Sequence, residues 1–214
     1  MASPLLLEDR RGLLVALEGI DGSGKSTQMK HLAEWLRPQG YGVVELREPT
    51  HGPIGSEIRR LAVEGRLDAE SEFRLFLEDR TENVEQNIAP GLRRGDIVLV
   101  DRYYISSMAY QGARGIDIER IRQENEKIAP RPDLVVMFEI PIQNALSRIT
   151  LRETDGPNHF EKADYLTKVQ AIFDRLDWPE IRRIDADRPQ EAIQTDLRQL
   201  LEPYVKRIAQ QPPQ

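Results

Sequence analysis

The sequence contains no cysteine among its 214 residues, which excludes disulfide bonds and thiolate metal sites. Histidine is scarce, with 3 residues, and aromatic residues make up only 6% of the chain. Long blocks of Lys or Arg are absent as well, and the formal net charge is −6. This charge disfavours a nucleic-acid polymer as partner, although a small phosphate site needs only a few arginines.

Long apolar runs are lacking too. Leu5–Leu7 is followed at once by Glu8 and Asp9, so this run is too short for the core of a signal peptide. No stretch approaches the roughly 20 residues that a membrane-spanning helix needs. Hydrophobic residues make up 39% and charged residues 31%, which is typical of an ordinary globular protein. We therefore expect no membrane partner, a cytoplasmic location and a single domain over residues 1–214.

One glycine-rich segment stands out near the N-terminus. It fits the phosphate-loop pattern G-x-x-x-x-G-K-[ST] and reads Gly19-Ile20-Asp21-Gly22-Ser23-Gly24-Lys25-Ser26, with Thr27 after it. An apolar strand precedes it and helical spacing follows, so backbone N–H groups and a helix N-terminus converge on an anion. The loop predicts a nucleoside triphosphate site, with Lys25 on the terminal phosphates and Ser26 on Mg²⁺. The alternative is a tight turn whose glycines serve only geometry.

Strand and helix signals alternate along the chain, which predicts an α/β fold of three layers. With the phosphate loop, we expect a P-loop NTPase fold: a five-stranded parallel sheet with helices on both faces and a short lid at about 148–161. The expected strands are 13–18, 43–47, 96–100, 134–138 and 181–184. The expected helices are 24–39, 55–64, 71–92, 105–111, 117–127, 141–152, 160–176 and 189–209.

Two charged residues end the third expected strand. Asp101 lies at the carboxyl edge of the sheet, where ligands of open α/β sheets bind. We expect this carboxylate to face the phosphate loop and to hold Mg²⁺ together with Ser26. Arg102 beside it offers a fork of donors for a second phosphate. The alternative is a structural ion pair at the end of a strand.

Two pairs of residues are spaced four apart on expected helices. Phe76 and Arg80 share one helix face, where a ring can stack on a nucleobase and a guanidinium can bind its edge. Taken alone, the pattern favours a core position for Phe76 and a solvated surface charge for Arg80. Arg148 and Arg152 repel each other at this spacing, which suggests an anion between them. Exposed arginines that suit the helix dipole are the alternative.

Five segments in order resemble the thymidylate kinase family, which makes dTDP from dTMP and ATP. They are Gly19–Thr27, Arg47–Pro49, Gly55–Arg59, Phe76–Arg80 and Asp101–Gly112. The last segment, D-R-Y-x-x-S-x-x-A-Y-Q-G, is the most particular to this family. The resemblance extends from Leu13 to about Leu201 and implies Mg²⁺ with ATP, dTMP as acceptor and a homodimer.

The resemblance also implies roles for single residues. Nine of them would bind dTMP: Asp21, Glu48, Arg59, Phe76, Arg80, Arg102, Ser107, Tyr110 and Gln111. Phe76 would stack on thymine, Arg80 would contact the base edge, and Tyr110 would pack against the sugar. Arg59 and Arg102 would hold the dTMP phosphate. Arg148 and Ala186 would line the adenine side of the ATP site, and Arg152 would stabilise the transferring phosphoryl group.

The sequence also departs from the family pattern. Some members carry a catalytic arginine at the position of Gly22, so the positive charge is expected from Arg152 instead. Lys25, Asp21 and Arg102 complete the expected catalytic residues. Asn158-His159 in the lid and Leu77-Glu78 after the stacking phenylalanine are unusual. A kinase for another monophosphate or for a deoxynucleoside stays open, as does a nucleotide switch, although no N-K-x-D motif supports the switch.

Overall fold

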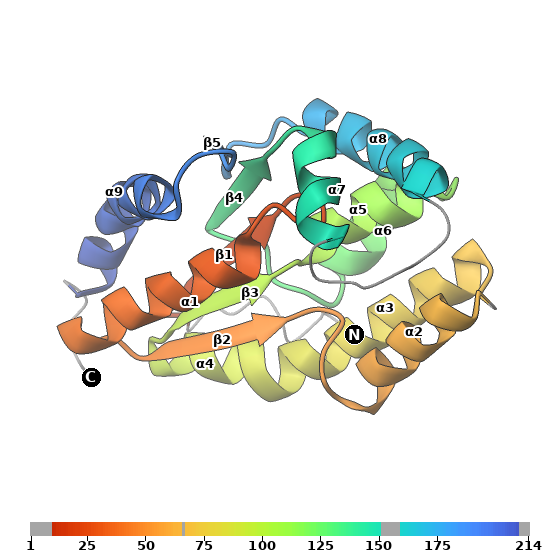
Figure 1. Ribbon diagram of the computed structural model, residues 1–214. Helices are drawn as coiled ribbons and strands as arrows, with labels where there is room; N and C mark the ends of the chain where they lie inside the picture. Colours follow the sequence, from red (N-terminus) through yellow and green to blue (C-terminus); the bar gives the residue numbers. More distant parts are fainter. Residues whose placement is uncertain (1–9, 66, 151–158, 210–214) are drawn as a thin grey trace.

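The computed structural model describes residues 10–65, 67–150 and 159–209. Five parallel strands form one sheet in the order β2-β3-β1-β4-β5 (Figure 1). The strands are β1 (Leu13–Glu18), β2 (Val43–Arg47), β3 (Ile97–Asp101), β4 (Leu134–Glu139) and β5 (Ile181–Asp185). The three central strands are almost continuously apolar and buried, as helices on both faces require. The predicted parallel α/β sheet is confirmed.

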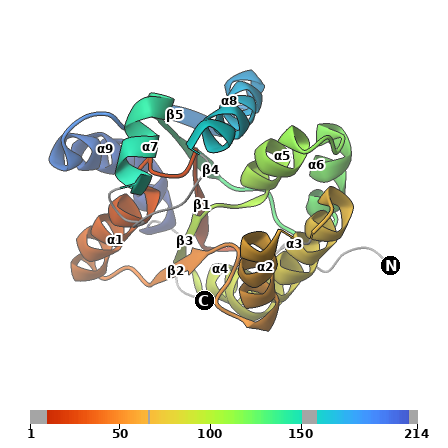
Figure 2. The same ribbon diagram turned by 45° about the vertical axis from the view of Figure 1, so that its right-hand side comes forward.

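Helices cover both faces of the sheet (Figure 2). The helices are α1 (Lys25–Leu36), α2 (Pro53–Glu64), α3 (Ala69–Asn83), α4 (Ala89–Arg94), α5 (Tyr104–Ala113), α6 (Ile118–Glu126), α7 (Ile142–Thr150), α8 (His159–Arg175) and α9 (Gln190–Ala209). Helices α1 and α9 pack together against β1, whereas α4 packs on β3 and α5 packs against α3, α6 and α8. The helix expected over 71–92 is divided, because a π-helical turn at Val84–Ile88 separates α3 from α4.

The strand ends prepare the site. Every strand finishes on a charged residue, and parallel strands bring these five residues to one edge: Glu18, Arg47, Asp101, Glu139 and Asp185. Apolar residues before each strand end anchor the strand in the core. The carboxyl edge of the sheet is therefore the polar edge, and the glycine-rich loop leaves β1 at this edge.

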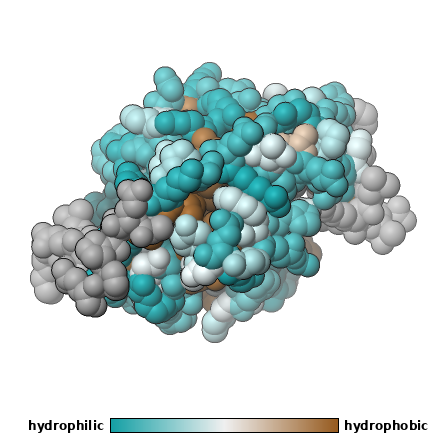
Figure 3. Space-filling view, turned by 90° about the vertical axis from the view of Figure 1, so that its left-hand side faces the viewer, coloured by the Kyte–Doolittle hydropathy of each residue, from teal (hydrophilic) through white to brown (hydrophobic). Residues whose placement is uncertain are grey.

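The outer surface matches the high content of charged residues. The side of the molecule that lies on the left in Figure 1 is mostly hydrophilic, and its largest group of apolar side chains lies in a hollow near the centre (Figure 3). Within the ranges described, no helix has the length and apolar character that crossing a bilayer requires.

Candidate active site

The phosphate loop surrounds the side chain of Lys25. Gly24, the N-cap of α1, has a left-handed backbone with φ 93°, which glycine adopts without steric cost. Lys25 Nζ donates to the carbonyls of Gly19 and Ile20 at 3.0 and 2.9 Å and to Ser23 Oγ at 3.2 Å. Burial and the charge of Arg102 lower the pKa of Lys25 to about 8. The loop therefore holds a buried cation beside the N-terminus of α1, which favours an anionic ligand.

Helix α7 explains why residue 22 is glycine. Gly22 has φ 81°, and a Cβ atom at this position would lie 2.4 Å from the carbonyl oxygen of Ala145. An arginine, as some family members carry here, has no room without a shift of α7. The loop therefore cannot supply this cation itself in the described conformation.

The side chains of Ser26 and Asp101 meet beside the phosphate loop. The Ser26 hydroxyl donates to Asp101 Oδ2, which joins the start of α1 to the end of β3. The second carboxylate oxygen, Asp101 Oδ1, is buried and has no hydrogen-bond partner in the described part of the chain. An unsatisfied buried carboxylate oxygen beside a hydroxyl suits a small hard cation. Among the described residues, no three His, Cys, Asp or Glu side chains gather as a metal site, so a cation here depends on ligand phosphates as well.

Arg102 ties the phosphate loop to α5. Its Nη2 donates to Asp21 Oδ1 at 2.6 Å and to the Tyr110 hydroxyl at 3.1 Å, and its Nη1 donates to Ser106 Oγ at 3.2 Å. Its guanidinium also lies 4.8 Å from the centroid of the Tyr110 ring. Desolvation raises the pKa of Asp21, but the charges of Arg102 and Lys25 outweigh it and lower this pKa to about 2. Asp21 is therefore ionised at neutral pH.

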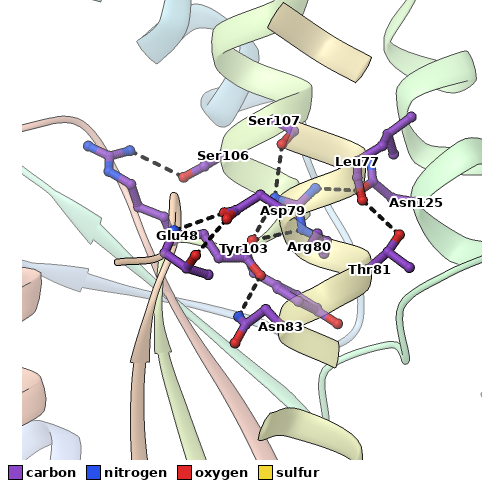
Figure 4. A network of polar contacts seen from close by, with 12 residues as sticks. Glu48, Leu77, Asp79, Arg80, Thr81, Asn83, Tyr103, Ser106, Ser107 and Asn125 are labelled. Atoms are coloured by element: carbon purple, nitrogen blue, oxygen red, sulfur yellow. Dashed lines mark hydrogen bonds and ion pairs between the residues drawn. The ribbon is translucent and has the colours of Figure 1, made fainter. Parts of the chain in front are cut away.

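Arg80 is buried in a network of side chains, which Figure 4 shows from close by. It is 1% exposed, and its Nε donates to Glu48 Oε2 at 2.7 Å. Its Nη2 donates to Ser107 Oγ at 3.1 Å and its Nη1 donates to Asn125 Oδ1. Asn83 donates to the other oxygen of Glu48 at 3.0 Å. The alternative of Arg80 as a solvated surface charge is wrong, because Glu48 after β2, Ser107 of α5 and Asn125 of α6 surround the guanidinium.

A cavity of about 310 Å³ opens between α3 and α5, and we call it the α3–α5 cavity. It is lined by all nine residues predicted for dTMP: Asp21, Glu48, Arg59, Phe76, Arg80, Arg102, Ser107, Tyr110 and Gln111. Phe76 is half-buried and lies on the same side of α3 as Arg80. Arg59 is held by the carbonyl of Pro49 at 2.8 Å and by Ser56 Oγ at 3.2 Å. Aromatic rings, Phe76 and Tyr110 among them, and arginines therefore share one cavity, which suits a base and a phosphate.

Two further cavities continue along the carboxyl edge of the sheet. The loop cavity, of about 100 Å³, is lined by Lys25, Ser26 and Asp101 and shares Asp21 and Arg102 with the α3–α5 cavity. The α7–α9 cavity, of about 320 Å³, shares Gly22, Gly24 and Thr27 with the loop cavity, and Arg148 and Ala186 also line it. The three cavities form one cleft with the phosphate loop at its centre.

Arg148 lies beside the phosphate loop and the end of β5. Its Nη1 donates to the carbonyl of Ala186 at 3.2 Å, and its Nη2 pairs with Asp187 at 3.3 Å. A carboxylate partner therefore accompanies this arginine. Arg152, its predicted companion, lies outside the described residues, as does most of the expected lid, including Asn158.

Four residues near the cleft were not predicted from the sequence. Glu72 and Tyr165 line the α3–α5 cavity, Asn125 holds Arg80, and Glu18 lies buried behind Arg102. Three of them belong to helices of ordinary pattern, where nothing in the spacing separates a pocket residue from a surface residue. Glu18 does carry a signal, because it is the one charged residue of an otherwise apolar strand.

A parallel sheet, a phosphate loop at its carboxyl edge and a cavity on either side of that loop define a protein of the P-loop NTPase class with a two-sided cleft. Comparison with known sequences narrows this class. A sequence model of the thymidylate kinase family matches residues 17–197. The chain belongs to the thymidylate kinase family.

Individual relatives agree with the family match. The thymidylate kinase of Akkermansia muciniphila is 48% identical over 194 residues, which cover 90% of this chain and 93% of the relative. That of Desulfotalea psychrophila is 44% identical over 192 residues, 89% of this chain and 95% of the relative. That of Xanthomonas euvesicatoria is 45% identical over 182 residues, 85% and 80% of the two chains. The similarity therefore spans the whole cleft.

Proposed function

We propose that the chain transfers the γ-phosphoryl group of ATP to dTMP and releases dTDP and ADP. The observation that carries this function is the α3–α5 cavity, which collects all nine predicted dTMP residues next to the phosphate loop. Membership of the thymidylate kinase family supports the same reaction. A deoxynucleoside acceptor would leave the charges of Arg59 and Arg102 without use.

The acceptor binds in the α3–α5 cavity. Phe76 stacks on the thymine ring, and Arg80 donates to its edge while Glu48 and Asn125 fix the guanidinium. Tyr110 packs against the sugar. Arg59 and Arg102 neutralise the acceptor phosphate, and this phosphate competes with Asp21 for the Nη2 donors of Arg102.

The donor binds on the other side of the loop. Residues 19–27 wrap the ATP phosphates with backbone N–H groups, and Lys25 exchanges its carbonyl partners for the terminal phosphates. The adenine lies in the α7–α9 cavity beside Arg148 and Ala186. The two nucleotides thus approach each other end to end across Asp21.

Ser26 and Asp101 are the residues that would hold Mg²⁺ with the ATP phosphates, as the free Asp101 Oδ1 supports. When bound, this ion neutralises phosphate charge that would otherwise repel the acceptor. Arg152, outside the described residues, stays a prediction as the second cation at the transferring group. The homodimer and the cytoplasmic location also stay predictions.

The transfer itself is an in-line displacement. An oxygen of the dTMP phosphate forms a bond to the γ-phosphorus as the bond to the β–γ bridging oxygen breaks, and ADP carries the electron pair away. The attacking oxygen is already anionic, so the reaction needs no general base. Catalysis rests on alignment and on charge neutralisation by Lys25 and Arg102.

A substrate panel tests the proposal. Release of ADP is coupled to NADH oxidation, with ATP and one acceptor at a time: dTMP, dUMP, dCMP, dGMP, dAMP or thymidine. We expect dTMP to give the highest kcat/KM and thymidine to give no turnover. Equal rates with and without acceptor would contradict a kinase, and faster turnover of another monophosphate would contradict dTMP as the substrate.

A further inference from the structure

Glu18 is a buried carboxylate to which the reaction gives no role. It ends β1, directly before Gly19 of the phosphate loop, and its relative exposure is 0%. It does not line the α3–α5 cavity or the loop cavity. A fully buried carboxylate is costly unless hydrogen bonds satisfy it, so its partners indicate what it does.

All the partners of Glu18 belong to the start of α5. Its Oε1 accepts from the backbone N–H of Tyr103 at 2.9 Å and of Ser106 at 3.3 Å, and its Oε2 accepts from Ser106 Oγ at 2.5 Å. Tyr103 is the N-cap of α5 and makes no side-chain cap of its own. The first N–H groups of a helix need acceptors from outside the helix. Glu18 supplies them from a different element, and its charge suits the helix N-terminus.

The residue just before this cap is Arg102. Its φ is +69°, the only positive value among the described non-glycine residues. Residues other than glycine keep this conformation only where their surroundings enforce it. Three contacts hold Arg102 on both sides: its N–H donates to the carbonyl of Leu17 at 3.0 Å, Tyr103 is tied to Glu18, and its Nη1 donates to Ser106 Oγ at 3.2 Å.

Ser106 connects the carboxylate to the guanidinium. The hydroxyl has one hydrogen, and Glu18 accepts it. The remaining lone pairs of Ser106 Oγ are then available to Arg102 Nη1, which can only donate. An ionised Glu18 therefore sets the direction of the hydroxyl and, through it, the plane of the Arg102 guanidinium.

We propose that Glu18 is a positioning residue that holds Arg102 in its left-handed conformation, aimed at the acceptor phosphate. The inference rests on the proposed function, because it assigns the phosphate of dTMP to Arg102. Glu18 acts through Tyr103 and Ser106 and touches neither nucleotide.

The test compares two ligands that differ only in the phosphate. Glu18→Gln keeps the shape of the side chain but replaces one acceptor oxygen with an NH₂ donor, which cannot accept from α5. Calorimetry at pH 8, above the raised Glu18 pKa of about 7, measures Kd for dTMP and for thymidine with the purified full-length chain. We expect Kd for dTMP to rise about tenfold or more, which is about 1.4 kcal/mol, and Kd for thymidine to change less than about twofold. The KM for ATP should also change little.

Two further variants complete the design. Glu139→Gln is the matched control: this carboxylate ends the neighbouring strand β4 and pairs with Arg183 at 2.7 Å near the surface. We expect it to leave both Kd values unchanged. Ser106→Ala removes only the bridging hydroxyl. It should raise Kd for dTMP but not Kd for thymidine, and the rise should be smaller than in Glu18→Gln. It also provides the test if the Glu18 variant does not fold.

The outcomes separate the two proposals. Equal losses for dTMP and thymidine in Glu18→Gln, or no loss for dTMP, would overturn the positioning role. If Glu18→Gln does not fold, unchanged dTMP binding by Ser106→Ala would overturn it. A wild-type chain that does not phosphorylate dTMP in the substrate panel would overturn the proposed function instead, whatever the variants do.

Discussion

The two sides of the cleft bind anions in different ways. On the donor side, nine consecutive residues, 19–27, supply backbone groups together with Lys25 and Ser26. On the acceptor side, the α3–α5 cavity is built from single side chains of α2, α3, α5 and α8, from residues at or just after the ends of β2 and β3, and from Asp21 of the loop. The donor site is thus local in sequence, whereas the acceptor site depends on tertiary packing.

Because of this difference, substitutions on the two sides of the cleft should affect different properties of the protein. Lys25 of the donor loop bonds only to groups of the same loop, so its side chain can be removed with little effect on the fold. The acceptor groups satisfy one another across elements, as Arg80 does with Glu48 and Asn125. Substitutions on the donor side should therefore change the rate, and substitutions in the Arg80 network should change stability together with dTMP binding.

Lys25→Ala should have the largest effect and only on catalysis. We expect kcat to fall by about 10³-fold, or about 4 kcal/mol, because a preorganised charge at the transferring group is lost. The melting temperature should not fall, because burial already disfavours the charged form of Lys25. Lys30→Ala, an exposed lysine on the same helix, is the control. A Lys25→Ala variant with lower stability and near-normal kcat would contradict the assignment of catalysis to the donor side.

Glu48→Ala should act on the fold. Removing one partner of a buried ion pair leaves the Arg80 charge without compensation, which costs about 3–5 kcal/mol of unfolding free energy. Arg80 and Glu48 are 1% exposed each, so water does not replace the lost contact. Urea denaturation measures the loss. Glu45→Ala removes a partly exposed carboxylate of β2, the strand that ends just before Glu48. This carboxylate pairs with Arg37, and its removal should cost less than about 1 kcal/mol. Similar losses in both variants would contradict the network.

Glu18 lies between the two sides of the cleft, and its burial should make the stability of the protein depend on pH. Burial raises its pKa from 4.5 to about 7, although Ser106 and the Tyr103 N–H oppose this. Between these two values the unfolded chain loses the proton and the folded chain keeps it. Stability therefore falls as pH rises through this window, by up to about 3 kcal/mol. The pKa of Asp21, about 2, changes stability only below this window.

Glu18→Gln should remove this slope. Free energies of unfolding are measured for both proteins from pH 4.5 to 7.5, and the value for the wild type minus that for the variant should decrease with pH. All other titrating groups are common to the two proteins, so their contributions largely cancel. Parallel curves would mean that Glu18 has an ordinary pKa in the folded state.

The contrast between a local donor site and an acceptor site built by packing also explains what the sequence could predict. The loop 19–27 follows from spacing alone, because its function depends on neighbours in the chain. The carboxyl-edge position of Asp101 follows from the parallel sheet. The burial of Arg80 does not, because its partners Glu48 and Asn125 lie 32 and 45 residues away and meet it only through packing. The division of residues 71–92 into two helices does have a signal in Pro90, which lies in the first turn of α4 just after the π-helical turn at Val84–Ile88.

Phe76 should give the smallest effect, because it lines the acceptor cavity without joining the Arg80 network. Phe76→Ala should raise Kd for dTMP about tenfold, since stacking of a base on an aromatic ring contributes about 1–3 kcal/mol. Calorimetry should find ATP binding unchanged, because Phe76 does not line the loop cavity or the α7–α9 cavity. Phe76→Leu keeps apolar bulk without a ring and should fall between the wild type and the alanine variant. Equal losses for both nucleotides would show that Phe76 supports the fold, and the acceptor side would then lack its base-stacking residue.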